Sequence, residues 1–323
     1  MRGVSVELAP VGRPPRRLTE EVDLAVPAGR TLALVGESGC GKSITALAAM
    51  RLLHEPLRLG GGEIILRARG REHDLARLKS AALRAMRGAE IGMIFQDPMT
   101  ALDPVFPIGE QIAETLLVHQ ALGRRAARNR AAELLNLVGM PDPARAAQAY
   151  PFQLSGGMRQ RVMIAIAIAC WPALLIADEP TTALDVTVQA QILELMRDLA
   201  ERLGMATLLI THDLGVVAEN AQEVAVMYRG RIVERASAEV LFAGPAHPYT
   251  RGLLASLPPL EGPRARLVPI PGQVPQTSPP AHACAFADRC PDVMPRCREA
   301  RPALATVASG QEAACFLHHD LAA

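Results

Sequence analysis

The stretch GESGCGKS, at residues 36–43, decides the fold because it matches the pattern G-x-x-x-x-G-K-[ST] of a phosphate-binding loop. The short apolar run at 31–36 predicts a buried strand before the loop, and residues 43–53 have the periodicity of a helix. Glycines in such a loop let backbone N–H groups surround phosphate oxygens. We therefore expect nucleotide contacts along the whole stretch, from Gly36, Glu37, Ser38, Gly39, Cys40, Gly41, Lys42, Ser43 and Ile44.

Two acidic residues at the end of a second apolar run complete a hydrolytic site. Lys42 is expected to reach the terminal phosphates of a nucleotide, and Ser43 to bind Mg²⁺. In LLIADE, residues 174–179, Asp178 is expected to hold the same Mg²⁺ through water, and Glu179 to polarise the attacking water as general base. An acidic strand end alone would be unremarkable, but with a phosphate loop it indicates nucleotide hydrolysis.

Strands and helices alternate along most of the chain, which predicts an α/β core with an antiparallel β part at the N-terminus. From about residue 97 to 165 the pattern is helical, so we expect a helical subdomain inserted into this core. The strands that we expect cover residues 3–8, 22–26, 31–36, 61–66, 91–96, 173–178 and 205–213, with a hairpin at 224–235.

Composition excludes several classes of protein. The 323 residues carry a net charge of +1, and no basic block alternates with aromatic residues, so nucleic acid is not an expected partner. The N-terminus has no apolar signal core, and the longest apolar run, at 162–177, is interrupted by Pro172 and too short to span a bilayer. We expect a soluble or peripheral protein whose six cysteines are reduced rather than paired in disulfides.

A second anion site is predicted far downstream, in LSGGMRQR at residues 154–161. Ser155, Gly156 and Gly157 open a predicted helix, where free N–H groups and the positive end of the helix dipole favour phosphate. For Ser155 alone, the alternative interpretation is a simple helix N-cap.

The motifs GESGCGKS, MIFQDP, LSGGMRQR, LLIADEP, TALD and THD occur in this order, and together they resemble the ATPase of an ABC transporter over about residues 20–235. The resemblance implies that two ATPase chains pack head to tail, so that Ser155, Gly156 and Gly157 contact ATP bound on the partner chain. It also assigns Gln96 to Mg²⁺ or the attacking water, Asp185 to the dimer interface, and His212 to sensing the γ-phosphate. One feature departs from the family pattern: no aromatic residue precedes the phosphate loop to stack on adenine.

The longer segments YPFQLSGGMRQRVMIAIAIA, DEPTTALDVTVQAQIL and PAHPYTRGLL resemble the ATPases of dipeptide/oligopeptide importers, the peptide/nickel group. This resemblance implies a peripheral protein on the cytoplasmic face of the inner membrane. It would work with two membrane permeases, a solute-binding protein and a second ATPase chain, either a homologue or a second copy. The alternatives are the same role for nickel or another small solute, an ABC ATPase of DNA repair or translation, and a non-catalytic regulatory binder.

The composition changes near residue 257, which predicts an ATPase domain at 1–256 and an extension at 257–323. The extension begins with a proline-rich linker and ends with Cys284, Cys290, Cys297 and Cys315. Four thiols can hold zinc or a [4Fe–4S] cluster, but the spacing alone leaves metal ligands and free buried cysteines equally open. The family resemblance favours a metal site, with an iron–sulfur cluster before zinc.

Overall fold

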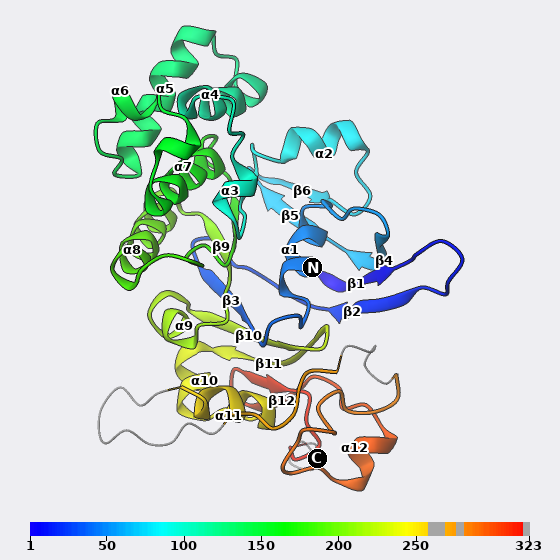
Figure 1. Cartoon of the computed structure of the whole chain (residues 1–323). Helices are drawn as coiled ribbons and strands as arrows, with labels where there is room; N and C mark the ends of the chain where they lie inside the picture. Colours follow the sequence, from blue (N-terminus) through cyan, green and yellow to red (C-terminus); the bar gives the residue numbers. More distant parts are fainter. Residues whose placement is uncertain (258–268, 276–280, 319–323) are drawn as a thin grey trace.

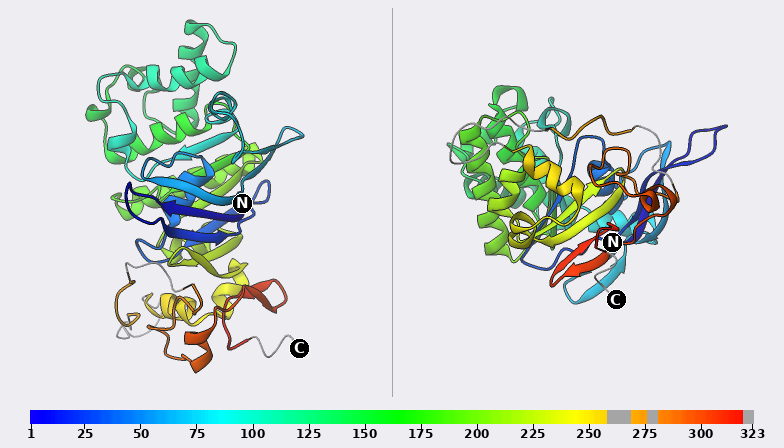
Figure 2. Two further views of the ribbon diagram at one scale, coloured as in Figure 1. Left: turned by 90° about the vertical axis from the view of Figure 1, so that its right-hand side faces the viewer. Right: turned by 90° about the horizontal axis from the view of Figure 1, so that it is seen from below.

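The computed structural model describes residues 1–257, 269–275 and 281–318 (Figure 1). An α/β core lies in the middle, a helical block at one end and a C-terminal extension at the opposite end (Figure 1). The side view in Figure 2 shows the same order. In these described ranges, no helix is both long and apolar enough to cross a membrane.

The central sheet brings the ends of several predicted strands to one edge. Its strand order is β12-β13-β11-β10-β3-β9-β8-β7, and β7, β8, β9, β3 and β10 are parallel neighbours. The carboxyl ends of parallel strands meet at the same edge, which is where ligands bind in α/β sheets. The bounds are β3 Thr31–Val35, β7 Ile91–Ile94, β8 Leu174–Asp178, β9 Ala206–Ile210, β10 Glu223–Tyr228, β11 Arg231–Ser237, β12 Ala305–Ala308 and β13 Gln311–Ala313.

Helices follow the strands as the sequence predicts. The longest, α8 (Val186–Leu203), buries one face against the core and ends at Gly204, which adopts the left-handed conformation typical of a helix C-terminus. The hairpin of β10 and β11 forms at the predicted position, with its turn at Arg229 and Gly230. The remaining helices of this part are α1 Lys42–Ala49, α2 Ser80–Met86, α9 Leu214–Asn220, α10 Ala238–Ala243 and α11 Pro248–Ala255.

The helical block packs on the core through a shared apolar cluster. Ile112 of α4, Leu134 of α5 and Ile164 of α7 are fully buried in the same cluster as Leu175 of β8 and Ile192 of α8. The block and the sheet therefore share one close-packed interior. The elements of the block are α3 Pro98–Ala101, α4 Ile108–His119, α5 Arg124–Leu137, α6 Pro143–Ala146, the 3₁₀ turn η1 Pro151–Gln153 and α7 Gly156–Ile168.

The N-terminal part is an antiparallel sheet of order β2-β1-β4, beside a hairpin of β5 and β6. The predicted strand at 22–26 is wrong: β2 covers Arg16–Val22, and residues 23–26 lie outside any strand. The buried positions of β2 include Thr19 and Glu20. Because these residues are polar, the sequence of β2 lacks the apolar pattern that would have predicted a strand there. The other bounds are β1 Arg2–Leu8, β4 Leu57–Glu63, β5 Ile65–Ala68 and β6 Arg71–Asp74.

The C-terminal extension joins the central sheet. β13 pairs antiparallel with β11, opposite Glu234, Arg235 and Ala236, and β12 pairs with β13 (Figure 2). The helix α12 (Pro295–Glu299) and the cysteine-bearing loops lie next to it. Most of the predicted proline-rich linker, at 258–268 and 276–280, falls outside the described residues. The boundary near residue 256 stays a prediction.

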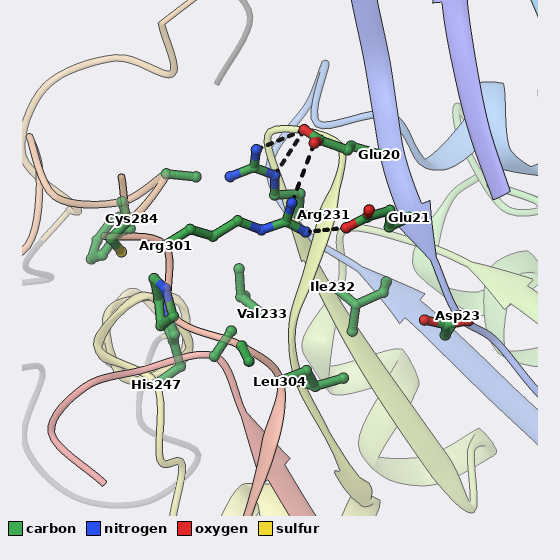
Figure 3. Close-up of a pocket in the computed structure, with 15 residues that line it drawn as sticks. Glu20, Glu21, Asp23, Arg231, Ile232, Val233, His247, Cys284, Arg301 and Leu304 are labelled. Atoms are coloured by element: carbon green, nitrogen blue, oxygen red, sulfur yellow. Dashed lines mark hydrogen bonds and ion pairs between the residues drawn. The ribbon is translucent and has the colours of Figure 1, made fainter. Parts of the chain in front are cut away.

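A buried ion-pair network ties the extension to the N-terminal sheet (Figure 3). Arg231 of β11 donates to Glu20 over 2.6 Å, and Arg301 of the extension donates to the other oxygen of Glu20 over 3.2 Å. Arg301 also lies 2.9 Å from Glu21. These residues line a cavity of about 350 Å³ between the two parts. Burial alone would raise the pKa of Glu20, but Arg231, Arg301 and Arg17 together lower it below 4.5.

Glu20→Gln should destabilise the protein in a pH-dependent way. Breaking a buried pair leaves an uncompensated charge and costs about 3 kcal/mol. Because the pKa of Glu20 is lowered by folding, its contribution is present above the ordinary value of 4.5 and is lost as the pH falls below it. Thermal unfolding should therefore begin at a lower temperature in Glu20→Gln than in the wild type at pH 7.5. The difference should shrink towards acid pH, and a constant difference at both pH values would contradict the assignment.

Candidate active site

The phosphate loop connects β3 to α1 in a conformation that requires glycine. Gly36 has φ of 153°, and a Cβ atom added there would lie 2.2 Å from the carbonyl oxygen of Met227. Gly41 has φ of 110° and precedes the first residue of α1, Lys42. The loop can therefore keep its shape only without side chains at these two positions.

Lys42 points back over the loop. Its Nζ atom donates to the carbonyl oxygens of Gly36, at 2.7 Å, and Glu37, at 3.1 Å. The residue is buried, so its charge lies in an environment of low dielectric, where attraction to phosphate is stronger than in water. Nζ thus lies over the loop, and its expected contact with the terminal phosphates stays a prediction.

The predicted magnesium ligands are in direct contact. The Ser43 hydroxyl donates to Oδ1 of Asp178 over 3.0 Å, at the start of α1 and the end of β8. A hydroxyl and a carboxylate are the hard oxygen ligands that Mg²⁺ requires. Burial raises the pKa of Asp178, an effect that Ser43 and Lys42 partly oppose and that the neighbouring Glu179 reinforces. A buried carboxylate of this kind gains from a bound cation, so Ser43 and Asp178 fit Mg²⁺.

Glu179 is held by residues that follow three neighbouring strands. Gln96, which follows β7, donates to Oε2 of Glu179 over 2.9 Å. Nδ1 of His212, which follows β9, lies 3.2 Å from Oε1. Thr182 donates a third contact, to Oε2, over 3.0 Å. The structure thus brings together the three residues predicted for catalysis, and adds Thr182, which the sequence analysis missed although it lies within the DEPTT segment.

The backbone of Glu179 is strained, and its neighbours stabilise the charged carboxylate. Its φ of 47° lies in the left-handed region, a strained conformation that clusters at functional sites. Burial acts to raise its pKa, but the contacts with His212 and Thr182 and the charge of Lys42 outweigh it and lower the pKa below 4.5. These contacts favour the charged form of the carboxylate, and the role of Glu179 as general base stays a prediction.

The predicted signature residues lie apart from the phosphate loop. Ser155 caps α7 by accepting from the N–H of Met158 at 3.3 Å, and Gly156 is exposed like Ser155. Figure 1 shows α7 in the helical block, whereas the phosphate loop lies in the core. Asp185 caps α8 in the same way, by accepting from Val188 over 3.0 Å. The start of α7 and the phosphate loop therefore lie in different parts of the chain.

The signature and the Asp185 segment form one exposed surface. A Cβ atom on Gly157 would lie 2.6 Å from Val188, so the two helix starts are packed closely. Val186, next to Asp185, is 83% exposed, so a large apolar side chain lies on this surface.

The four C-terminal cysteines are free thiols gathered in one region. Cys297 and Cys315 are buried, and the N–H of Cys284 donates to the carbonyl oxygen of Cys297 at 2.8 Å. Burial raises the pKa of Cys290 to about 11, opposed by the backbone N–H of Asp292 and reinforced by the charges of Asp292, Cys284 and Cys315. Within the described residues, however, no three His, Cys, Asp or Glu side chains are placed to hold a metal ion. The side chains as they lie do not form the predicted metal site.

Comparison with known families decides the identity of the core. Residues 19–182, which contain the phosphate loop, Gln96, the signature and Glu179, match the family model of ABC transporters. The chain belongs to this family. It is an ABC-type ATPase, and the predicted phosphate-loop α/β fold is confirmed. A second family model, the C-terminal region of oligopeptide/dipeptide transporters, matches residues 233–297 of the ATPase.

Curated relatives resemble the ATPase over most of its length. A probable peptide ABC transporter ATP-binding protein of Sinorhizobium fredii is 52% identical, with 93% of this chain and 89% of the relative covered. The oligopeptide transport ATP-binding protein AppD of Bacillus subtilis is 50% identical over 93% and 90%. The dipeptide transport ATP-binding protein DppD of Escherichia coli is 47% identical over 95% and 92%. The predicted resemblance to peptide-importer ATPases is confirmed.

A solved structure shares the fold. The ATP-binding cassette MJ0796, described as a dimer in a post-hydrolysis state bound to ADP and Pi, has a TM-score of 0.63 and 26% identity. The alignment covers 73% of this chain and 97% of the MJ0796 chain.

Proposed function

We propose that this ATPase powers the import of dipeptides or oligopeptides through a membrane ABC transporter. The observation that carries the proposal is the presence, in one chain, of a complete set of ATPase motifs and of the C-terminal region typical of peptide transporters. The relatives named for peptide transport match more than nine tenths of the chain, so the likeness is not limited to the ATPase core.

Hydrolysis proceeds through residues of the core. The loop from Gly36 to Ile44 binds the phosphates, with Lys42 at the terminal ones. Ser43 and Asp178, with Gln96, are the residues that would hold Mg²⁺, which neutralises charge on the phosphate oxygens. Glu179 accepts the proton of the attacking water, and His212 contacts the γ-phosphate. The contacts among Glu179, Gln96 and His212 support these roles, because they place the carboxylate before any substrate arrives.

The active unit is a dimer of ATPase chains, with a homologous chain or a second copy. Ser155, Gly156 and Gly157 contact the γ-phosphate bound on the partner, and Asp185 lies at the interface. Their common exposed surface supports this arrangement. Since only an intact γ-phosphate reaches both chains, hydrolysis weakens the interface and opens the dimer.

The ATPase acts at the cytoplasmic face of the cell membrane as a peripheral subunit. Two membrane permeases and a solute-binding protein complete the importer, and nucleic acid has no part in it. The helical block, which shares its apolar interior with β8, carries movement from the nucleotide site to the permeases.

The test is reconstitution of the ATPase with permeases and a binding protein encoded beside it. We expect phosphate release to rise when the binding protein is loaded with peptide, and not when it is loaded with nickel. Stimulation by nickel alone would reassign the cargo. Unchanged phosphate release with every solute, from a complex that binds ATP, would refute a role in import.

We propose in addition that the four C-terminal cysteines bind a metal centre, a [4Fe–4S] cluster before zinc. Their gathering in one region supports this, as the N–H of Cys284 donates to the carbonyl oxygen of Cys297 and Cys290 lies near Cys284 and Cys315. Because the side chains are not arranged as ligands, binding requires them to shift, and no step of hydrolysis depends on the centre. Anaerobic purification should give a brown protein with about four iron atoms per chain. A colourless protein without iron or zinc would remove the proposal.

A further inference from the structure

A side chain of the C-terminal extension reaches the phosphate loop. The guanidinium of Arg289 makes two hydrogen bonds to the carboxylate of Glu37, over 2.7 Å from Nη1 and 2.9 Å from Nη2. The Arg289 side chain is only 5% exposed. A bidentate pair of this kind, shielded from water, is stronger and more directional than an exposed ion pair. The second residue of the loop is therefore bound to a residue 252 positions away.

The backbone of the same loop residue is also held from the C-terminal side. The hydroxyl of Tyr249, in α11, accepts the N–H of Glu37 at 2.8 Å. The carbonyl oxygen of Glu37 accepts Nζ of Lys42 at 3.1 Å. Glu37 thus joins Arg289, Tyr249 and Lys42 in one continuous chain of contacts.

Packed rings keep Arg289 and Tyr249 in place. The guanidinium carbon of Arg289 lies 5.8 Å from the ring centre of Tyr228, and that ring lies 4.6 Å from the ring of Tyr249. Phe286, three residues before Arg289, packs edge-on against Tyr228 at 5.2 Å. Because these side chains are buried, Arg289 has little freedom to move away from Glu37.

The extension itself is anchored at two further places. β13 pairs with β11 in the central sheet, and Arg301 binds Glu20 and Glu21 of the N-terminal sheet (Figure 3). The carbonyl oxygen of Pro271 accepts Nε of Arg289 at 2.8 Å. Arg289 therefore contacts the phosphate loop from an extension that is itself fixed to both the central and the N-terminal sheet.

We propose that Arg289 is a positioning residue for the phosphate loop, through which the C-terminal extension holds Glu37 and prepares the loop for the phosphates of ATP. The inference rests on the nucleotide site proposed above. Arg289 acts in two ways: it neutralises a carboxylate that would otherwise repel phosphate, and it keeps the loop ordered before the nucleotide binds. The extension is therefore part of the ATP site, although its residues follow the last ATPase motif by many positions.

The test is equilibrium binding of the non-hydrolysable analogue AMP-PNP with Mg²⁺ to the full chain. We expect the Kd of Arg289→Met to rise on the order of tenfold. The turnover at saturating ATP should change far less, because Glu179 and its partners are untouched. Adding Glu37→Gln to Arg289→Met removes the repelling carboxylate and should restore most of the affinity. Arg298→Met, at an exposed pair with Asp288 in the same extension, is the matched control and should bind as the wild type does.

The outcomes separate this inference from the proposed function. If Lys42→Ala loses binding while Arg289→Met matches the wild type, the ATP site stands and the inference is overturned. A defect of Arg289→Met that Glu37→Gln does not relieve at all also overturns the inference, because an unpaired Glu37 carboxylate is then not what weakens binding. If Lys42→Ala binds normally, the nucleotide site itself is misplaced.

Should Arg289→Met fail to fold, Arg289→Lys keeps the charge but loses the double contact. Its Kd must then lie above that of the wild type, and an unchanged Kd refutes the inference.

Discussion

Glu179→Gln should stop ATP hydrolysis while leaving ATP binding intact. The amide keeps the size of the side chain and its contacts with Thr182 and His212, but it cannot accept a proton from water. Loss of a general base slows turnover by about 10²–10⁴-fold. Phosphate release by the variant should therefore fall to the background of the assay, whereas AMP-PNP binds with nearly the wild-type Kd.

The matched control is Glu201→Gln, an exposed glutamate near the end of α8. It carries the same chemical change outside the site and should hydrolyse ATP at the wild-type rate. Near-normal turnover in Glu179→Gln would assign the general base to another residue. Loss of AMP-PNP binding would mean that the carboxylate is needed for the structure of the site rather than for chemistry.

Ser155→Arg should also abolish hydrolysis, but through the dimer. The larger side chain fills the start of α7, where the partner's γ-phosphate is expected, so the closed dimer cannot form. Since the phosphate loop of the same chain is untouched, the isolated chain should still bind AMP-PNP. Turnover and dimerisation with ATP, the latter measured by light scattering in the Glu179→Gln background, should fall together.

Ser155→Asp separates phosphate recognition from helix capping. Aspartate caps a helix as well as serine does, so α7 should keep its stability. Its charge would nevertheless oppose the partner's γ-phosphate, and hydrolysis should be lost as in Ser155→Arg. Full hydrolysis by Ser155→Asp would mean that Ser155 only caps α7 and does not contact the γ-phosphate. Lost nucleotide binding in the isolated chain would contradict the assignment across the dimer.

The local motifs predicted most of the ATPase core, because each depends on neighbouring residues. The phosphate loop needs Gly36 and Gly41 for its backbone, and a strand and a helix on either side supply its context. Gln96 and His212 were assigned to the site of Glu179 by the family resemblance, and the structure shows that each of them follows a strand of the parallel sheet. Thr182 was missed because a threonine in a turn has no signal of its own until the structure shows its hydroxyl on Glu179.

The parts that the sequence did not predict depend on distant partners. β2 buries Thr19 and Glu20, and Glu20 can be buried only because Arg231 and Arg301 neutralise it. Both arginines lie more than 200 positions away in the sequence, so the residues around Glu20 do not predict these contacts. In the same way, the contact of Arg289 with Glu37 joins opposite ends of the chain, and short-range patterns carry no information about it.

The pairing of β13 with β11 has a practical consequence for shortened versions of the protein. Ending the polypeptide after residue 256 would leave β11 as the outermost strand, with an open row of backbone donors and acceptors. Such an edge recruits strands from other molecules, so the trimmed protein should aggregate on expression even though every ATPase motif is retained. A tag or a cleavage site is therefore better placed away from the paired strands β11 and β13.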